Sequence, residues 1–423
     1  MQCLILCGGL GTRLSKKYKN TPKALIKFNK KENLGLLVEN LKKSSIEKFV
    51  FLTSYNSNPI KKYVRNKLNV KYNIYDDSYY TGTGGAILNQ LRNLEKEFLV
   101  ILGDLYCDFD FKKFLKFSRE KKSNVCLTVH ANSHPHDSDT VEFNSKFQIK
   151  KFILKNSKKL SENNALSGIY YFKKNYLNNF NTKKKHVDLL RDIIIKNPTK
   201  IYAYKSLDYV KDYGTVKRIS QIKKDIKKKA FKKSKFGVFV DRDGVLNKEM
   251  GPITKINDFH LIPGVGQSIK KLNKNFIPCF MVSNQAAVAN GLIDIKTLKL
   301  INCKLDNYLA KYSAYMDDIL ICPNSKTKNF STKEYSFLWK DRKPNPGMIK
   351  ELSNRHNIDI KKSYFIGDSD IDILCGKKIK MKTILVKSPR IKKYRFNVEP
   401  DFKVNNLTEA VKLIFENEKI HIS

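Results

Sequence analysis

Short apolar runs alternate with longer amphipathic stretches along the first half of the chain. The apolar runs predict strands at Gln2–Leu6, Phe49–Thr53, Phe98–Leu102, Val125–Val129 and Ile169–Phe172. The stretches between them predict helices that include Leu36–Lys43, Pro59–Lys67 and Ala86–Leu94. Short strands that alternate with helices form mostly parallel sheets covered on both faces. The first half therefore predicts a doubly wound α/β domain.

A second alternating series follows in the other half of the chain. Its apolar runs predict strands at Gly237–Val240, Cys279–Val282, Asp318–Cys322, Tyr364–Ile366 and Thr383–Val386. Between the two series, residues 221–235 read QIKKDIKKKAFKKSK, with eight lysines against one aspartate. We interpret residues 223–235 as a helix end followed by a linker. The sequence thus predicts two α/β domains, at residues 1–222 and 236–423.

Composition narrows the class of protein. The 423 residues are 41% hydrophobic, enough for two or three packed cores. No apolar run approaches the ~20 residues of a membrane helix, and the first residues carry no secretory pattern. The eight cysteines form no CxxC pair, which is typical of a reduced, cytoplasmic protein. We therefore expect a cytoplasmic protein without a membrane partner.

The net charge of +42 leaves a nucleic-acid-binding protein open as a minor alternative. However, lysine is spread along the whole chain, and no RNA-binding motif with interleaved aromatic residues is present. We expect the charge to attract anionic nucleotides and sugar phosphates instead.

A glycine-rich segment directly follows the first predicted strand. Gly8, Gly9 and Gly11 allow backbone amides to approach phosphates without a Cβ clash. Arg13 offers a planar, permanently charged donor, and Lys23 offers a second cation. This arrangement suits a nucleoside triphosphate.

Three further motifs follow in order. Residues 81–85, Thr-Gly-Thr-Gly-Gly, precede the predicted helix and offer a second close backbone approach. Asp104 ends a strand and therefore lies at the carboxyl edge of the sheet, where α/β sheets bind ligands. Asp212 supplies a second carboxylate. Two carboxylates together with a triphosphate make a Mg²⁺ site.

The order GGLGTR, TPKAL, GTGGA, LGD and DYGT over residues 1–220 resembles the sugar-1-phosphate nucleotidyltransferases. The resemblance implies a Rossmann-like domain in which a sugar phosphate oxygen attacks the α-phosphate of a nucleoside triphosphate and pyrophosphate leaves. It also implies that Arg13 and Lys23 balance phosphate charge and that Asp104 and Asp212 hold Mg²⁺. The implied nucleotide contacts are Gly8, Gly9, Gly11, Thr12, Gly84 and Gly85.

The second half carries an aspartate pair after its first predicted strand. Asp241 could attack phosphorus to form an aspartyl phosphate, while Asp243 protonates the departing alkoxide. Later strands end in Ser283-Asn284, which offer a hydroxyl and an amide to phosphate, and in Asp368, which offers a metal ligand. Lys343 adds a cation. These residue types together indicate phosphoryl transfer.

The motifs DRDGVLN, SNQAAVANG, DRKPNPGM and GDSDID resemble the haloacid dehalogenase (HAD) superfamily of phosphatases. They are most similar to its heptose 1,7-bisphosphate and histidinol-phosphate phosphatases. The resemblance implies that Asp241 is the nucleophile, Asp243 the acid/base, and Ser283, Asn284 and Lys343 phosphate ligands. It implies Mg²⁺ ligands at Asp241, Asp243 and Asp368. The short spacing between Asp243 and Ser283 predicts a minimal cap.

Relatives of this branch carry a zinc loop of the form Cys-x-His…Cys-x-Cys. Here only Cys322 remains before the Arg-Lys-Pro motif, with Asp341 close to it. One thiol and one carboxylate do not make a closed structural zinc site. We therefore expect no zinc, and expect Phe337 and Trp339 to hold the loop by packing.

The two resemblances match consecutive steps of one route. We predict a bifunctional enzyme that removes the 7-phosphate of D-glycero-D-manno-heptose 1,7-bisphosphate and transfers a nucleotidyl group, with GTP favoured, to heptose 1-phosphate. Its product would serve lipopolysaccharide or capsule synthesis, and both sites would need Mg²⁺. The same activities on another sugar phosphate, or histidinol-phosphate hydrolysis at the second site, remain alternatives. The sequence leaves the anomer and the oligomeric state open.

Overall fold

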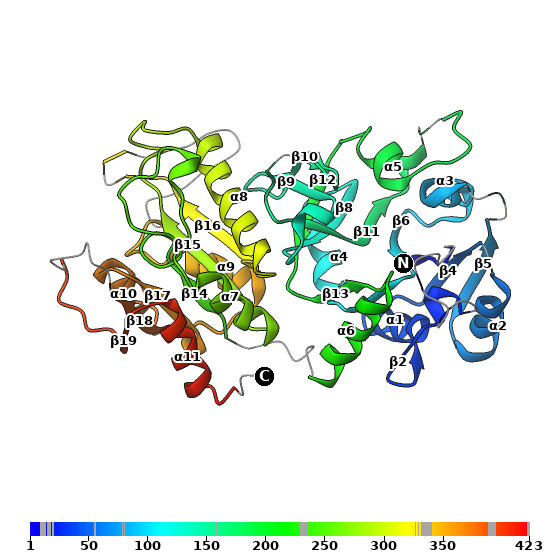
Figure 1. The fold of residues 1–423 in the computed structure, drawn as a ribbon. Coiled ribbons are helices and arrows are strands. Elements are labelled where there is room, and N and C mark those ends of the chain that lie inside the picture. The colour runs from blue at the N-terminus through cyan, green and yellow to red at the C-terminus, as the bar shows by residue number, and fades with distance from the viewer. Residues whose placement is uncertain are drawn as a thin grey trace. The chain divides into compact units, whose positions relative to one another are not determined.

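The computed structural model describes residues 1–8, 14, 18, 21–54, 56–77, 79, 81–157, 160–178, 180, 182–228, 236–325, 327–328, 330, 341–387 and 395–420. The chain divides into two compact units (Figure 1). The first unit comprises Met1–Val129, Phe147–Phe152 and Leu166–Lys232, and the second comprises the rest. Within the described ranges, no helix is long and apolar enough to cross a membrane. The boundaries given above for the domains stay predictions.

A twisted sheet forms the centre of the first unit. Strands β1 (Gln2–Leu6), β4 (Lys48–Thr53), β5 (Lys71–Asp76), β6 (Glu97–Leu102) and β11 (Ala165–Lys173) lie in the order β11-β6-β1-β4-β5. Strand β1 pairs in parallel with β4 and β6, whereas β11 runs antiparallel to β6. All five residues of β1 are buried. Burial on both faces explains why this strand is a continuous apolar run.

Further strands extend or flank this sheet. Strand β8 (Val125–His130) pairs with β11 and with β12 (Ile201–Lys205). Strands β7 (Leu105–Asp108) and β13 (Tyr209–Asp212) form a separate antiparallel pair. The short remaining strands are β2 (Lys27–Phe28), β3 (Lys31–Glu32), β9 (Thr140–Phe143) and β10 (Ile149–Ile153). The five strands predicted for this half are all present, which confirms the α/β assignment.

Helices flank the sheet of the first unit. The predicted helices near residues 36–43 and 59–67 are confirmed as α1 (Asn33–Lys42) and α2 (Asn58–Lys67). The structure adds α4, α5 and α6, together with short helical turns and one π-helix. Their bounds are α4 Phe111–Glu120, α5 Asn175–Asn178, α6 Val216–Lys227, η2 Lys23–Leu25, η3 Leu91–Asn93 and η5 Leu189–Ile194. The turn η4 (Pro135–Asp137) lies in a segment of the second unit.

The helix predicted at residues 86–94 was wrong in its position. Helix α3 spans Gly82–Leu88, so the glycine motif forms the start of the helix rather than a loop before it. The backbone N–H and hydroxyl of Thr81 donate to Asp77 at 2.9 and 3.0 Å, which fixes the entry of the chain. The helix has no side-chain cap, but the N–H groups of Gly84 and Gly85 in its first turn donate to the Val187 carbonyl at 2.8 and 3.3 Å. These contacts offset the low helix propensity of glycine.

The lysine-rich segment begins as a packed helix. Ile219, Ile222 and Ile226 of α6 are buried in a small core that includes Phe28. Opposite them, lysines line the exposed face, as in other amphipathic helices. Residues 229–235, the remainder of the predicted linker, lie outside the described residues.

The second unit has a six-stranded sheet that is parallel throughout. Its order is β16-β15-β14-β17-β18-β19. The strands are β14 (Val238–Val240), β15 (Cys279–Asn284), β16 (Asp318–Cys322), β17 (Tyr364–Gly367), β18 (Lys382–Val386) and β19 (Phe402–Val404). Five of them coincide with the predicted runs, and β19 was not predicted.

Helices cover both faces of this sheet. Apolar residues of α7 (Val265–Lys274), α8 (Ile295–Lys311) and α11 (Leu407–Asn417) share one core with inward residues of β14 and β15. On the opposite face, His356 of α9 (Gly347–His356) stacks on Phe280 with ring centroids 5.4 Å apart. Helix α10 (Asp370–Lys377) packs against β17 and β18. The short turns are η6 (Ile256–Asp258) and η8 (Ile360–Lys362). The doubly wound arrangement predicted for this half is confirmed.

Candidate active sites

In the second unit, the predicted phosphoryl-transfer residues meet at the carboxyl edge of the sheet. Asp241 directly follows β14, Ser283 lies near the end of β15, and Asp368 follows β17. These strands are neighbours, with β14 between β15 and β17. Because parallel strands place their carboxyl ends at one edge, three distant motifs converge there.

Lys343 links two carboxylates at this edge. Its Nζ lies 2.8 Å from Asp241 Oδ1 and 2.7 Å from Asp372 Oδ1. The lysine is 4% exposed. Burial lowers the pKa of Lys343, but the two carboxylates outweigh this and raise the pKa above its usual value. A permanently charged amine is therefore held beside the predicted nucleophile.

Three carboxylates gather closely enough to hold a metal ion. Ligand oxygens of Asp241, Asp368 and Asp372 all lie within 4.8 Å of one another. Hard oxygen donors of this kind suit Mg²⁺. The motif GDSDID contains Asp372, but the sequence assigned a ligand role to Asp368 alone; Asp368 precedes α10, whereas Asp372 lies in its first turn. The residues present therefore fit a magnesium ion.

Close backbone packing supports this cluster. A Cβ built on Gly244 would lie 2.0 Å from Asp368 Oδ2, and one on Gly367 would lie 2.2 Å from Asp372 Cβ. Ser369 and Asp372 form a capping box at the start of α10. The two later carboxylates are thus fixed by the glycines and by the helix start.

The electrostatics of Asp241 reflect its surroundings. Burial is the main cause that raises the pKa of its carboxyl to about 7; Lys343 opposes the rise, while Asp372 and Asp243 add to it. A divalent cation at the carboxylate cluster favours the ionised form that a nucleophile needs.

Asp243 is held by a separate set of donors. Arg242 donates to both of its carboxylate oxygens, through Nη2 at 3.0 and 3.1 Å. Gln285 Nε2 donates to Oδ2 at 2.6 Å, and Asn247 Nδ2 donates to Oδ1 at 2.9 Å. Arg242 and Gln285 were not singled out from the sequence, since their types alone do not distinguish them from surface residues. The metal role implied for Asp243 stays a prediction.

Ser283 and Asn284, the predicted phosphate ligands, differ in their partners. Ser283 Oγ accepts a hydrogen bond from Gln285 Nε2 at 2.9 Å. Asn284 Nδ2 donates to the carbonyl of Lys343 at 3.0 Å, and Asn284 Oδ1 accepts from the N–H of Lys343 at 3.0 Å. The Asn284 amide therefore contacts the segment that carries Lys343.

The segment considered for zinc is described only in part. Cys322 is buried at the end of β16, and burial raises the pKa of its thiol. Phe337 and Trp339, which we expected to hold the loop, lie outside the described residues. The expectation that zinc is absent stays a prediction.

In the first unit, Lys23 and Asp104 form an ion pair. Lys23 Nζ lies 3.2 Å from Asp104 Oδ2. Tyr213, fully buried, places its hydroxyl 3.2 Å from the Lys23 carbonyl and 3.1 Å from the Gly103 carbonyl. Its N–H donates to the Asp104 carbonyl at 3.1 Å. One tyrosine therefore fixes the backbones that carry both predicted site residues.

Asp212 lies on the strand next to Asp104. In the β7–β13 pair, Asp212 is opposite Leu105, the residue after Asp104. Its carboxylate is paired with the guanidinium of Arg218. Asp104, in the turn before β7, and Asp212, at the end of β13, thus approach one region, while each also has a basic partner.

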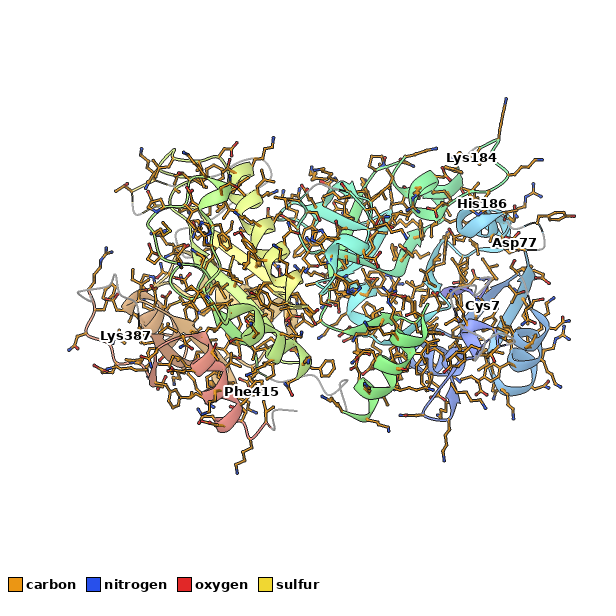
Figure 2. The ribbon with its side chains drawn as sticks, viewed as in Figure 1. Cys7, Asp77, Lys184, His186, Lys387 and Phe415 are labelled. Atoms are coloured by element: carbon orange, nitrogen blue, oxygen red, sulfur yellow. The ribbon has the colours of Figure 1, made fainter. Side chains whose placement is uncertain are left out.

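The predicted nucleotide contacts fall into two groups. Of the glycine-rich loop, Gly8 is described, whereas Gly9, Gly11, Thr12 and Arg13 lie outside the described residues. Gly8 follows Cys7, which is labelled in Figure 2.

Gly84 and Gly85 pack inside the first unit. The N–H of Gly84 donates to the Val187 carbonyl at 2.8 Å, and a Cβ on Gly84 would lie 3.0 Å from Val187 Cγ1. Figure 2 marks Asp77 and His186 on the segments beside this helix. The glycines therefore allow close helix packing, and their nucleotide role stays a prediction.

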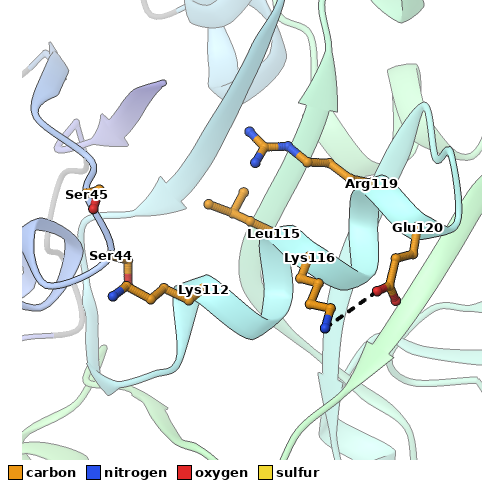
Figure 3. Close-up of a pocket in the computed structure, with 7 residues that line it drawn as sticks. All are labelled: Ser44, Ser45, Lys112, Leu115, Lys116, Arg119 and Glu120. Carbon is orange, nitrogen blue, oxygen red and sulfur yellow. Dashed lines mark ion pairs between the residues drawn. The ribbon is translucent and has the colours of Figure 1, made fainter.

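A separate hollow of about 440 Å³ lies over α4 (Figure 3). Its charged residues are partly neutralised, since Arg119 pairs with Glu97 at 3.0 Å and Lys116 with Glu120 at 3.9 Å. Glu97 begins β6, so the hollow lies toward the amino ends of the strands. This is the edge opposite the one where α/β sheets bind ligands. The lining residues are Ser44, Ser45, Lys112, Leu115, Lys116, Arg119 and Glu120.

Comparison with known proteins identifies two families. Residues 2–229 match the nucleotidyl transferase family, and residues 341–410 match a HAD-hydrolase-like family. The chain is 33% identical over 184 residues to D-glycero-D-manno-heptose-1,7-bisphosphate 7-phosphatase of Thermosynechococcus vestitus, covering 42% of this chain and 94% of that protein. It is 34% identical over 188 residues to D-glycero-alpha-D-manno-heptose 1-phosphate guanylyltransferase of Campylobacter jejuni, covering 44% of this chain and 81% of that protein.

Among solved structures, HddC from Yersinia pseudotuberculosis is 23% identical to this chain with a TM-score of 0.47. The match covers 53% of this chain and 99% of HddC.

Proposed function

The chain belongs to the nucleotidyl transferase family and joins that domain to a HAD-like phosphatase, and from this premise we propose that it is a bifunctional enzyme of nucleotide-heptose synthesis. Its second unit removes the 7-phosphate of D-glycero-D-manno-heptose 1,7-bisphosphate. Its first unit then transfers GMP from GTP to the heptose 1-phosphate and releases pyrophosphate. The product of one site is the substrate of the other.

The observation that carries the proposal is the Asp241–Lys343–Asp372 cluster beside Asp368. A carboxylate held against a buried amine and two further carboxylates suits nucleophilic attack on phosphorus with a bound cation. A binding protein without catalysis has no need to bury this set of charges, because burying them costs free energy.

The phosphatase reaction proceeds through Asp241. Its carboxylate oxygen attacks the phosphorus of the 7-phosphate, and the bond from phosphorus to the sugar oxygen breaks. Asp243 gives a proton to the departing alkoxide. A water molecule then attacks the aspartyl phosphate while Asp243 takes back a proton, which releases inorganic phosphate. Lys343 neutralises phosphate charge in both steps.

Magnesium bound by Asp241, Asp368 and Asp372 would supply charge neutralisation for the phosphate oxygens. The remaining recognition falls to loops at the carboxyl edge of the sheet, because the chain between Asp243 and Ser283 holds α7 and short turns. An accessible edge of this kind suits a sugar bisphosphate.

The transferase reaction needs no covalent intermediate. An oxygen of heptose 1-phosphate attacks the α-phosphorus of GTP, and the bond to the β-phosphate oxygen breaks. Lys23 balances the charge that develops on the phosphates, and Asp104 and Asp212 would hold the cation that accompanies the triphosphate and neutralises its charge. Catalysis therefore rests on positioning and charge neutralisation.

Mass analysis of products tests the proposal. The full chain is incubated with Mg²⁺, each nucleoside triphosphate in turn, and either the α- or the β-anomer of heptose 1,7-bisphosphate. We expect GDP-heptose, inorganic phosphate and pyrophosphate, with one anomer strongly preferred because both sites must accept the same intermediate.

Two controls separate the activities. Supplying heptose 1-phosphate directly should give GDP-heptose without release of inorganic phosphate. Omitting nucleotide should stop the reaction at heptose 1-phosphate. Phosphate release from histidinol phosphate but not from the heptose bisphosphate would overturn the assignment of the second unit.

A further inference from the structure

Asn284 forms a paired contact with a single residue, Lys343. Its amide nitrogen donates to the Lys343 carbonyl at 3.0 Å, and its amide oxygen accepts from the Lys343 N–H at 3.0 Å. A planar amide thus binds both backbone groups of one residue, in the manner of a strand partner. Two hydrogen bonds of this kind fix the position and the direction of the Lys343 backbone.

The two partners differ in how firmly the fold holds them. Asn284 is the last residue of β15, and its strand register is set by pairing with β16. Lys343 instead lies between strands, where the chain makes a turn from Arg342 to Asn345 with a hydrogen bond of 2.8 Å. The sheet therefore positions the turn through Asn284, rather than the reverse.

The Lys343 amine must meet two oxygens at once. It lies 2.8 Å from Asp241 and 2.7 Å from Asp372. A misplacement of ~1 Å in a catalytic group costs about 100-fold in rate, so contacts that fix the Lys343 backbone help to keep its amine in this position. Loss of the Asn284 amide would leave two peptide groups of Lys343 without these partners.

We propose that Asn284 is a positioning residue for Lys343, acting on phosphoryl transfer through that lysine rather than as a phosphate ligand. This inference rests on the phosphatase function proposed above. It replaces the phosphate contact that the sequence suggested for this residue. Asn284 uses its acceptor and one of its two N–H groups on the lysine backbone, which leaves Ser283 and Lys343 as the groups that contact phosphate.

A double-mutant cycle in the full chain tests the proposal. Phosphate release is measured for the unaltered chain, Asn284→Ala, Lys343→Met and the double variant. Asn284→Ala should lower kcat by about 10- to 100-fold, as is usual when a supporting partner is removed. In the Lys343→Met background the same change should lower kcat by less than about twofold, because the residue it positions is gone. If the double variant loses kcat by the product of the two single effects, the two residues act independently and the proposal is overturned.

Inhibition by inorganic phosphate gives a second readout. A positioning role predicts that Asn284→Ala leaves the inhibition constant for phosphate unchanged in the Lys343→Met background, whereas a direct phosphate ligand predicts weaker inhibition there. Asn284→Ser, which keeps one short uncharged hydrogen-bonding group, should fall between the unaltered chain and Asn284→Ala. It also serves if the alanine variant fails to fold.

Asn275→Ala is the matched control. Asn275 also donates to a backbone carbonyl, that of Lys271 at 2.8 Å, but it lies on the exposed end of α7. It should change neither readout. Running the cycle with p-nitrophenyl phosphate makes the result independent of the sugar. If the unaltered chain fails to hydrolyse the heptose bisphosphate, the result counts against the proposed substrate alone. If the two substitutions lower kcat for p-nitrophenyl phosphate by the product of their separate effects, the result counts against the positioning role alone.

Discussion

Arg242 and Asp243 are neighbours in the chain, and the guanidinium of the first donates to both carboxylate oxygens of the second. Arg242 is fully buried, at 0% exposure. Its Nη2 also donates to Gln285 Oε1 at 2.8 Å, so that Gln285 turns its Nε2 toward Asp243. The residue between the two aspartates that we propose as catalytic is therefore part of the support for Asp243.

Arg242→Met should lower phosphatase turnover by about 10- to 100-fold, because Asp243 and Gln285 lose the partner that orients them. It should also lower the free energy of unfolding by about 2–3 kcal/mol. This is less than the usual cost of breaking a buried ion pair, since the Asp243 side chain keeps 20% exposure. Steady-state kinetics and denaturant unfolding measure both effects.

Arg355→Met is the control for stability. Arg355 pairs with Asp318 at 2.7 Å in the same unit, and Asp318 begins β16 at the amino edge of the sheet, away from the site. This variant should lose stability while keeping turnover. Equal losses of turnover in both variants would mean that Arg242 acts only on stability.

Asp241→Asn should abolish phosphate release, because an amide does not attack phosphorus at a useful rate. The substitution keeps the size of the side chain and removes one charge from the buried cluster. Formation of pyrophosphate from GTP and heptose 1-phosphate should continue in the same preparation, since the transferase residues lie in the other unit. Substantial phosphate release by this variant would exclude the aspartyl phosphate mechanism.

The sequence predicted the strands well because buried parallel strands are short, continuous apolar runs. It placed helix α3 wrongly, at residues 86–94 instead of Gly82–Leu88. Glycines indicate turns locally, but here the Val187 segment packs against them and Asp77 fixes the start of the helix. Tertiary contacts of this kind override local propensity and leave no signal in the glycine motif itself.

The structure brings together several residues that the sequence singled out for the second site, whose roles stay proposals, whereas their supporting contacts were not predicted. Asp241 and Lys343 carry chemistry that their residue types and motifs reveal. The roles of Arg242 and Gln285 depend instead on which side chains become neighbours after folding. Asn284 shows the same limit of sequence reasoning. An amide side chain beside a predicted phosphate site suggests a phosphate contact, and only the folded structure reveals that its hydrogen-bond partner is the Lys343 backbone.

Lys23→Ala should lower the rate of nucleotidyl transfer by about 30- to 1,000-fold. This corresponds to a loss of roughly 2–4 kcal/mol of transition-state stabilisation, as for the loss of one electrostatic donor. Asp104→Asn should show a comparable loss, together with a weaker response to Mg²⁺. Lys27→Ala is the matched control, because Lys27 is an exposed lysine paired with Glu32 at 3.4 Å. Phosphatase activity should stay constant in all three, and near-normal transfer by the first two would refute the site.

Metal removal should stop both activities. After chelation with EDTA, added Mg²⁺ should restore phosphate release and nucleotidyl transfer, since oxygen donors make up the carboxylate cluster. Asp372→Asn should raise the Mg²⁺ concentration needed for half-maximal phosphatase activity without changing that for transfer. Elemental analysis of the purified protein should find no zinc; a stoichiometric amount would demand ligands beyond Cys322.

Gly244 and Gly251 offer a matched pair of glycines in the second unit. Both have positive φ, 79° and 85°, so alanine at either position costs about 1–2 kcal/mol in backbone strain. Of the two, Gly244 lies against the site, where an added Cβ would come within 2.0 Å of Asp368 Oδ2, whereas none of the described residues comes within 4 Å of a Cβ on Gly251. Gly244→Ala should therefore displace Asp368 and remove most phosphatase activity, while Gly251→Ala should lose a similar amount of stability to backbone strain but keep its turnover. Thermal unfolding measures the shared cost, and the Mg²⁺ dependence of phosphate release measures the difference. If Gly244→Ala kept normal turnover and Mg²⁺ dependence, Asp368 would have no part in holding the metal.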